Sequence, residues 1–323
     1  MKHSRILVVG GSGFIGSHVV ARLAAQNRNV IVPSRRRERS RHLIMLPTVE
    51  VIEANVTEGD QLGGLVARCD AVINLAGILH GRPGRPYGPE FRSVHVELPR
   101  RLAELCRRAN LRRLIHLSAL GVGSGLEATP PSMYLRSKAA GEQALREMPE
   151  LDWTIMRPSV VFGPDDRFLN LFATLQRWLP VMLLARPTAR FQPIFVGDVA
   201  QAIVNALDNP VTFGKTYELV GPEVFSLRDL VALAGRLTGH PRPIIGLSDR
   251  LGRLQAAMLE FAPGPTLMSR DNFDSLAVDN VAGRTDSALA ADLGVVALPL
   301  SAIVPGYLRS SDRYNEARQH AHR

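Results

Sequence analysis

The sequence predicts a doubly wound parallel α/β sheet followed by a smaller α/β domain. Short β-rich runs alternate with amphipathic helical runs through the first half of the chain. This alternation needs helical crossovers, and therefore a parallel sheet that helices cover on both faces. The 323 residues, 46% of them hydrophobic and 21% charged, suffice for one large domain with a smaller companion.

Each predicted strand is a short apolar run bounded by turn residues. In chain order these runs cover 5–10 (RILVVG), 29–34 (NVIVPS), 49–55 (VEVIEAN), 71–77 (AVINLAG), 113–119 (RLIHLSA) and 152–163 (DWTIMRPSVVFG). Helical patterns fill the intervals at 17–26, 60–69 and 98–110, and the last of these places Leu98, Leu102 and Leu105 on one face.

The alternation loosens after residue 164, where the second part of the chain begins. A helix is predicted at 194–207, a strand at 215–221 and a helix at 226–237. We expect a first domain of residues 1–165 together with about 194–222, and a smaller substrate or lid domain of 166–193 and 223–323. The apolar run 177–185 (RWLPVMLLA) is expected to pack in a core, with contact to a membrane or a partner as the alternative.

The chain is basic, with a net charge of +9 and a pI near 10.3. Such a balance suits nucleic acid or an anionic membrane surface. No nucleic-acid partner is expected, because the arginines are scattered, aromatic residues make up only 6%, and no nucleic-acid motif occurs. A peripheral membrane contact stays open, whereas no apolar stretch is long enough to predict a transmembrane helix.

The two cysteines, Cys69 and Cys106, have neither metal-ligand spacing nor the pattern of a disulfide framework. Reduced thiols in a cytoplasmic protein are the expected state, and no metal site is predicted. The expected location is the cytoplasm, with attachment to the inner face of the membrane as the alternative.

A glycine-rich turn follows the first strand in VVGGSGFIGSHV. Gly10, Gly13 and Gly16 fit G-x-x-G-x-x-G, and Gly11 in place of Gly10 also fits G-x-G-x-x-G. Such glycines form a tight turn, let a pyrophosphate approach the backbone, and pack the following helix on the strand. The helix N-terminus then offers N–H groups to the anion. A Rossmann-type dinucleotide site is therefore predicted here, with Phe14 and Ile15 in the same turn.

The end of the second predicted strand decides between the two dinucleotides. An NAD site has a carboxylate about 20 residues after the glycines to bind the ribose 2′-hydroxyl. This chain has Ser34, Arg35 and Arg36 there, and Glu38 lies further on. Guanidinium groups bind a phosphate, so NADP(H) is favoured over NAD(H). The alternative is an ordinary basic surface turn.

Tyr134 and Lys138 lie four residues apart in a helical segment, and so on one helix face. A phenol has an ordinary pKa of about 10, and a nearby ammonium lowers it toward the range of a proton donor and acceptor. We therefore predict Tyr134 as the acid/base and Lys138 as the residue that tunes the pKa of its phenol.

These residues together resemble the short-chain dehydrogenase/reductase superfamily, in its extended branch. YLRSKAAGE, RPSVVFGPDDRFLN and FVGDVAQAIVNAL are most similar to the atypical group that contains the NADPH-binding accessory subunit of mitochondrial complex I and its bacterial relatives. The resemblance covers about residues 1 to 225. It implies that Asn55 and Val56 border the adenine, and that Asn74, Leu75, Ala76 and Gly77 line the floor of the cofactor site. It also implies that the stretch from Pro158 to Val160 faces the nicotinamide, and that Tyr134 and Lys138 bind the nicotinamide ribose.

Two positions depart from the active members of that superfamily. Ala119 stands where a serine would hold the substrate carbonyl, and the adjacent Ser118 points to the opposite face of a regular strand. His95 stands where an asparagine of the active site would be. The imidazole is either a proton relay or a packed helix residue.

Two functions therefore compete. The first is an NADP(H)-dependent oxidoreductase on a small hydrophobic carbonyl substrate such as a quinone, which the intact Tyr134 and Lys138 favour. The second is a non-catalytic NADPH-bound structural or redox-sensing protein of the respiratory chain, which Ala119 and His95 favour. The sequence inclines slightly to the enzyme.

Overall fold

The computed structural model describes residues 2–123, 129–264, 266–283 and 292–308. The chain divides into two compact units. The first comprises Met1–Pro158, Gly197–Leu219 and Gly283–Val296, and the second comprises Ser159–Val196, Val220–Ala282 and Ala297–Arg323.

The first unit is built on a seven-stranded parallel sheet with the order β11-β6-β5-β4-β1-β2-β3. Strand order reverses between β1 and β4, which makes this a doubly wound sheet and confirms the predicted fold class. The strands are β1 (Arg5–Val9), β2 (Asn29–Ser34), β3 (Val49–Glu53), β4 (Ala71–Asn74), β5 (Arg113–Leu117), β6 (Asp152–Pro158) and β11 (Lys215–Leu219).

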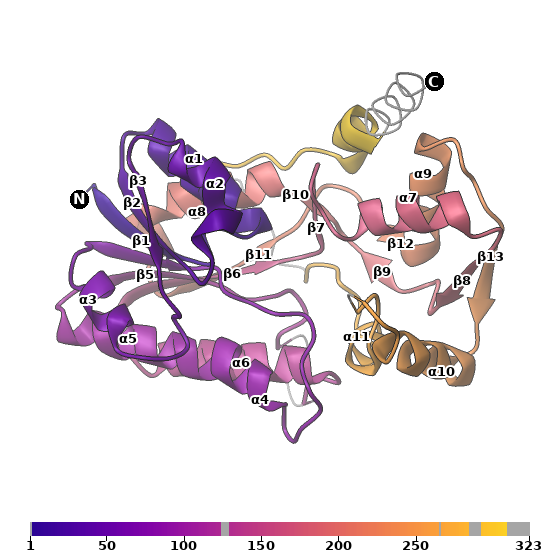
Figure 1. The fold of residues 1–323 in the computed structure, drawn as a ribbon, viewed down its shortest axis with the longest axis horizontal. Helices are drawn as coiled ribbons and strands as arrows, with labels where there is room; N and C mark the ends of the chain where they lie inside the picture. Colours follow the sequence, from indigo (N-terminus) through magenta and orange to yellow (C-terminus); the bar gives the residue numbers. More distant parts are fainter. Residues whose placement is uncertain (1, 124–128, 265, 284–291, 309–323) are drawn as a thin grey trace. The chain divides into compact units, whose positions relative to one another are not determined.

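Helices cover both faces of this sheet, with α1 and α8 on one side and α3, α5 and α6 on the other (Figure 1). Their bounds are α1 (Phe14–Ala25), α3 (Gln61–Val66), α5 (Leu98–Arg108), α6 (Met133–Arg146) and α8 (Val196–Leu207), with the short α2 (Arg41–Ile44) and α4 (Pro89–Phe91). Single turns of other helix types occur at η1 (Arg37–Ser40), η2 (Arg92–Glu97) and η3 (Pro210–Thr212). The central strands are buried throughout, as expected of a sheet that is covered on both faces.

In the part that the structure describes, the second unit contains three short strand pairs, the helices α7, α9, α10 and α11, and a further helical stretch at residues 300–308. Its elements are β7 (Val161–Phe162), α7 (Leu169–Trp178), β8 (Met182–Ala185), β9 (Arg190–Phe191), β10 (Ile194–Phe195), β12 (Phe225–Ser226), α9 (Leu227–Leu237), β13 (Ile244–Leu247), α10 (Asp249–Glu260) and α11 (Arg270–Ser275). A core of aromatic and aliphatic residues such as Phe162, Leu230 and Val304 lies within it.

The structure corrects three details of the sequence analysis. The strand expected at 71–77 ends at Asn74, so residues 75–77 form a loop. Asp292 belongs with the first unit and not with the predicted second domain, because its carboxylate accepts from Lys215 Nζ (2.9 Å) and the Tyr217 hydroxyl (2.7 Å). The run 177–185 is not wholly buried, since Trp178 is 83% exposed.

No helix in the described part of the chain is long and apolar enough to span a bilayer.

Candidate functional site

The candidate site lies in the first unit, where the carboxyl ends of β1 and β4 meet. The Leu75 N–H donates to Val9 O at 2.8 Å, which ties the loop after β4 to the end of β1. Gly10 has a φ of +80°, and a Cβ there would lie 2.8 Å from the backbone nitrogen of Ala76. This reversal point is where doubly wound sheets bind their ligands.

The glycine turn forms a cradle that side chains would fill. A Cβ on Gly16 would lie 2.2 Å from the Gly10 carbonyl oxygen and 2.7 Å from Gly11 Cα. Gly13 is the N-cap of α1 and supplies no side chain to bond the N–H groups of the first turn. Free N–H groups at the start of a 12-residue helix attract an anion. These residues fit the pyrophosphate of a dinucleotide, with Phe14 and Ile15 in the first turn of the helix.

The end of β2 presents two guanidinium groups to solvent. Arg35 and Arg36 are exposed, and neither has an ion-pair partner among the described residues. The Ser34 hydroxyl is buried and donates to Arg36 O at 3.1 Å, which shapes the turn. Glu53, an exposed carboxylate that is not apparent from the glycine spacing, stands beside Ser34 in the β2–β3 register.

Four further predicted cofactor residues have structural contacts of their own. Asn55 accepts from the Thr57 N–H and hydroxyl, and its amide donates to Glu58 at 3.0 Å, so both ends of the side chain are bonded within a turn. Val56 packs against the main core, and Pro158 is the buried last residue of β6. Val160 belongs to the second unit, where its N–H donates to Asn280 at 3.0 Å.

Lys138 connects the helix α6 to the floor of the site. The α6 N-terminus is set by Ser132, whose hydroxyl accepts from the Leu135 N–H. One turn on, the Lys138 ammonium is 3% exposed and donates to Leu117 O at 3.0 Å. A Cβ on Gly77 would lie 3.3 Å from Lys138 Nζ, so this ammonium stands directly against the loop after β4. The glycine cradle, residues 75–77 and Lys138 are thus contiguous.

The environment of the Tyr134 phenol is apolar and buried. Burial raises the pKa of Tyr134 to about 12. Burial also lowers the pKa of Lys138 to about 8, and the carboxylate of Glu142 opposes that shift. The Tyr134 ring packs edge-on against Phe91 and His95. Desolvation is therefore the cause of the raised pKa of Tyr134.

His95 is a packed and fully bonded side chain. The Ile78 N–H donates to its Nε2 at 3.0 Å, so that nitrogen carries no proton. The neutral ring then has its proton on Nδ1, which donates to the Ser137 hydroxyl at 2.8 Å, and Ser137 donates to Tyr134 O at 2.7 Å. Burial, followed by the charge of Lys138, lowers the pKa of His95 to about 2. Of the two readings that the sequence left open, the structure supports the packed residue.

The chain continues as a regular extended strand after β5, through Ser118 and Ala119. Ser118 and Leu120 donate to alternate β6 carbonyls, those of Met156 (2.7 Å) and Pro158 (2.9 Å), as in a regular parallel ladder. Ser118 and Ala119 therefore point to opposite faces. Ala119 is buried in a small apolar cluster against which Tyr134 packs, whereas the buried Ser118 hydroxyl has no hydrogen-bond partner within the described residues.

A buried carboxylate that the sequence analysis missed lies one turn beyond Lys138. Glu142 is fully buried and accepts two bonds from Arg157, at 2.8 and 2.7 Å. Arg146 adds a third at 2.9 Å. This network joins α6 to β6 directly behind Lys138.

A second buried imidazole, His116 on β5, faces Asn74 on β4. The Ala76 N–H donates to Asn74 Oδ1, so the amide of Asn74 donates to His116 Nδ1 at 3.1 Å. The proton of His116 is therefore on Nε2, which has no partner among the residues that the structure describes. Burial lowers the pKa of His116 to about 3.

The two histidines predict a loss of stability in mild acid. Both pKa values lie well below the ordinary 6.5, so unfolding takes up protons once the pH falls below that value. The free energy of unfolding should fall by up to about 2.7 kcal/mol per pH unit below pH 6.5, since each proton contributes about 1.36 kcal/mol. Urea denaturation at pH 7 and pH 5 measures this slope, and His116→Gln should reduce it by half. Equal stability at the two pH values would contradict the assignment.

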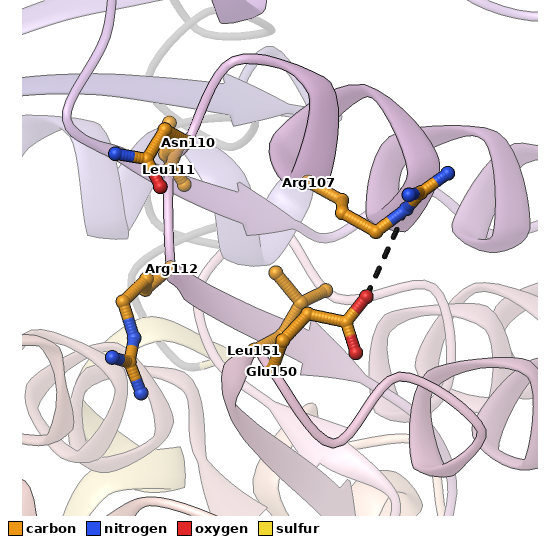
Figure 2. A pocket seen from close by; sticks show the side chains of 6 residues that line it. All are labelled: Arg107, Asn110, Leu111, Arg112, Glu150 and Leu151. Atoms are coloured by element: carbon orange, nitrogen blue, oxygen red, sulfur yellow. Dashed lines mark ion pairs between the residues drawn. The ribbon is translucent and has the colours of Figure 1, made fainter.

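A hollow of about 320 Å³ elsewhere in the first unit is not part of this site. Its lining residues lie just before β5 and β6 in the chain (Figure 2): Arg107, Asn110, Leu111, Arg112, Glu150 and Leu151. It therefore lies at the amino ends of the strands, opposite the glycine cradle. Arg107 and Glu150 form an ion pair of 3.8 Å across it.

Comparison with known proteins supports the same type of site. Residues 6–220 match the model of the NAD dependent epimerase/dehydratase family. The chain is 33% identical over 300 residues to "NADH dehydrogenase [ubiquinone] 1 alpha subcomplex subunit 9, mitochondrial" of Arabidopsis thaliana, covering 87% of this chain and 71% of the relative. The protein of that name from Mus musculus is also 33% identical, covering 91% and 76%.

Solved structures with similar folds include sugar-nucleotide enzymes. MoeE5 in complex with UDP-glucuronic acid and NAD has a TM-score of 0.75 at 21% identity and covers 97% of this chain and 100% of its own. DesIV, a dTDP-glucose 4,6-dehydratase from Streptomyces venezuelae with NAD and TYD bound, has a TM-score of 0.74 at 21% identity, covering 94% and 96%. At these identities the likeness concerns the fold. By its sequence match, its doubly wound sheet and its glycine cradle, the chain belongs to the NAD dependent epimerase/dehydratase family, in the extended branch of the short-chain dehydrogenases/reductases.

Proposed function

We propose that this protein binds NADP(H) as a resident cofactor and acts as a non-catalytic accessory protein of a respiratory NADH dehydrogenase. The observation that supports this proposal concerns Ala119 and His95, the two positions at which active members of the superfamily hold the substrate. In this chain both side chains are engaged in packing or hydrogen bonds within the protein. Ala119 is buried in an apolar cluster, and His95 is bonded through both ring nitrogens. The 33% identity to two mitochondrial subunit 9 proteins supports the respiratory assignment.

The proposed roles of the cofactor residues follow from their positions. The cradle of Gly10, Gly13 and Gly16 holds the pyrophosphate, and the loop at 75–77 supports the nicotinamide half. Lys138, with its ammonium against Gly77, binds the nicotinamide ribose. Asn55 and Val56 border the adenine, and Pro158 and Val160 face the nicotinamide. NADP(H), when bound, would supply hydride chemistry. At positions 95 and 119, however, no side chain offers a free polar group to orient a substrate.

The second candidate is an NADP(H)-dependent oxidoreductase on a hydrophobic carbonyl substrate such as a quinone. The specific observation in its favour is the intact pair of Tyr134 and Lys138 on one face of α6. Against it, losing one oriented donor typically lowers a rate by about 10²- to 10³-fold, and here two positions have changed. A phenol with a pKa of about 12 is also a poor acid/base near neutrality.

Two measurements distinguish the two candidate functions: the rate of NADPH oxidation and the rise in melting temperature that NADPH causes. We expect saturating NADPH to raise the melting temperature, because a ligand at 100 times its Kd stabilises by about 2.7 kcal/mol. We expect no NADPH oxidation above background with a panel of quinones and ketones. If the wild-type protein oxidised NADPH steadily with one of these acceptors, and Tyr134→Phe abolished that oxidation, the protein would be an oxidoreductase instead. Tyr134→Phe should leave NADPH binding nearly unchanged under either function.

The preference for NADP(H) rests on Arg35 and Arg36 at the end of β2. Arg35→Ala combined with Arg36→Ala should lower NADPH affinity by about tenfold or more, since each bond to a charged phosphate contributes about 1.5–3 kcal/mol. NADH affinity should change little. Titration calorimetry measures both, with Arg37→Ala as the matched control in the same exposed turn. Equal losses for NADPH and NADH would refute a bond to the 2′-phosphate.

A further inference from the structure

Helix α10, in the second unit, lies on the parallel strand pair β8–β13 with its small residues inward. A Cβ on Gly252 would lie 2.9 Å from Ala185 Cβ on β8, and Ala256, one turn on, is completely buried. The Gln255 amide donates to Leu183 O at 3.0 Å. These contacts hold one side of the helix close to the two strands (Figure 1) and leave another side open.

The open side of α10 carries large apolar side chains. Leu251, Leu254, Met258 and Phe261 follow one another at intervals of three, four and three residues, which places them in one stripe. They are 54%, 57%, 68% and 78% exposed. We call this stripe, together with Leu183 and Ile245, the α10 apolar face.

Leu183 and Ile245 extend the stripe onto the neighbouring strands. They are register partners on β8 and β13 and are 50% and 52% exposed. Leu183 is the residue whose carbonyl binds Gln255, which directly follows Leu254. Exposed apolar residues that gather on neighbouring elements suit a contact site, whereas singly scattered ones need no explanation.

Basic groups border the α10 apolar face. Arg250 and Arg253 directly precede Leu251 and Leu254, so both lie on the same flank of the stripe. Beside Ile245, Arg228 donates to the backbone carbonyl of Ile244 at 2.8 Å, and its charge contributes to the lowered pKa of the neighbouring, exposed Asp229. Arg250 has no ion-pair partner among the described residues.

Three carboxylates close to this face are neutralised by arginines. Asp249 and Glu260, at the two ends of α10, pair with Arg186 and Arg270, each at 2.9 Å. Asp274 on α11 pairs with Arg253 at 2.8 Å. The same pairs neutralise Arg186, Arg253 and Arg270, so the uncompensated charge on this part of the rim is that of Arg250. No exposed carboxylate in the described part of α10 and α11 is unpaired.

We propose that the α10 apolar face docks on the surface of an anionic lipid membrane. Leucine, methionine and phenylalanine side chains enter the boundary between head groups and acyl chains, while neighbouring arginines meet lipid phosphates. The face spans a helix and two strands, and a fluid lipid surface adapts to it without a preformed groove. The net charge of +9 adds a general attraction to an anionic bilayer. This inference goes beyond the proposed function, because no residue of the face belongs to the dinucleotide site.

Vesicle sedimentation of the full chain tests the proposal. The protein should sediment with vesicles of phosphatidylcholine and phosphatidylglycerol, and much less with phosphatidylcholine alone. Leu254→Ser combined with Met258→Ser should lower the partition coefficient by about tenfold or more, through the lost apolar area. Arg250→Glu should lower it too and reduce its salt dependence. Met45→Ser, at an 82% exposed residue of the first unit, is the matched control and should bind as wild type.

Three results would overturn the proposal. The first is a wild-type protein that does not sediment with anionic vesicles. The second is a Leu254→Ser, Met258→Ser variant that binds as tightly as wild type, which would move the contact to the basic surface elsewhere. The third is a concentration-dependent dimer, abolished by the same two substitutions and without vesicle binding, which would assign the face to a second copy of the chain. Because the substituted side chains are exposed, unchanged thermal unfolding checks that the variants fold.

Discussion

Gly16→Ala should weaken NADPH binding by about tenfold to a hundredfold and destabilise the first unit by about 1–3 kcal/mol. The added methyl group would lie 2.2 Å from Gly10 O and 2.7 Å from Gly11 Cα. Both atoms are backbone, so the methyl group can be accommodated only if the glycine turn moves. That movement displaces the N–H groups at the start of α1 from the position where they bind a pyrophosphate.

Gly64→Ala is the matched control for this prediction. Gly64 lies in α3, and a Cβ there would meet nothing within 4 Å. Alanine should therefore leave NADPH affinity unchanged and stabilise the helix by about 0.5–1 kcal/mol. Calorimetric titration and urea denaturation of the two variants measure both quantities. If Gly16→Ala bound NADPH as wild type does, the cradle would not be the pyrophosphate site.

Glu142→Gln should lower the free energy of unfolding by about 3–5 kcal/mol. The carboxylate is fully buried and accepts from Arg157 at 2.8 and 2.7 Å and from Arg146 at 2.9 Å. An amide of the same size leaves the guanidinium of Arg157, which is 14% exposed, without a counter-charge. The pKa of Lys138 should fall further, because Glu142 opposes the lowering that burial causes.

Glu147→Gln, one turn and a half further along the same chain segment, is the control. Glu147 is exposed and accepts a single bond from Gln143, so its change should stay within about 0.5 kcal/mol. Urea denaturation at pH 7.5 compares the three proteins. A loss below about 1 kcal/mol for Glu142→Gln would show that the network contributes little net stability.

The local features of the fold could be predicted from the sequence because they repeat over short distances. The apolar runs at 5–10 and 29–34 match β1 and β2 closely, and the glycine spacing indicated the turn between β1 and α1. Residues 75–77 had been assigned to a strand, since their apolar character does not distinguish a strand end from a buried loop. The structure brings that loop to Gly10 and Lys138, which is where the sequence analysis had placed the cofactor.

Features that depend on distant partners could not be predicted. Glu142 carries a visible signal, its position four residues after Lys138 on one helix, but nothing local pairs it with Arg157 on the next strand. The bonds of His95 to Ile78 and Ser137 likewise join segments 17 and 42 residues away. Asp292 joined the first unit through Lys215 and Tyr217, across more than 70 residues. The apolar face of α10 depends on which side of that helix the strands cover, and that also is a tertiary property.

The measurement that tests the central claim most directly is a calorimetric titration of the purified chain with NADPH, followed by NADH under the same conditions. We predict one NADPH per chain, a rise in melting temperature at saturation, and weaker binding of NADH because it lacks the phosphate that Arg35 and Arg36 would bind. Absence of both heat and thermal protection with either dinucleotide would contradict the account, because the cradle at the start of α1 would then hold no cofactor.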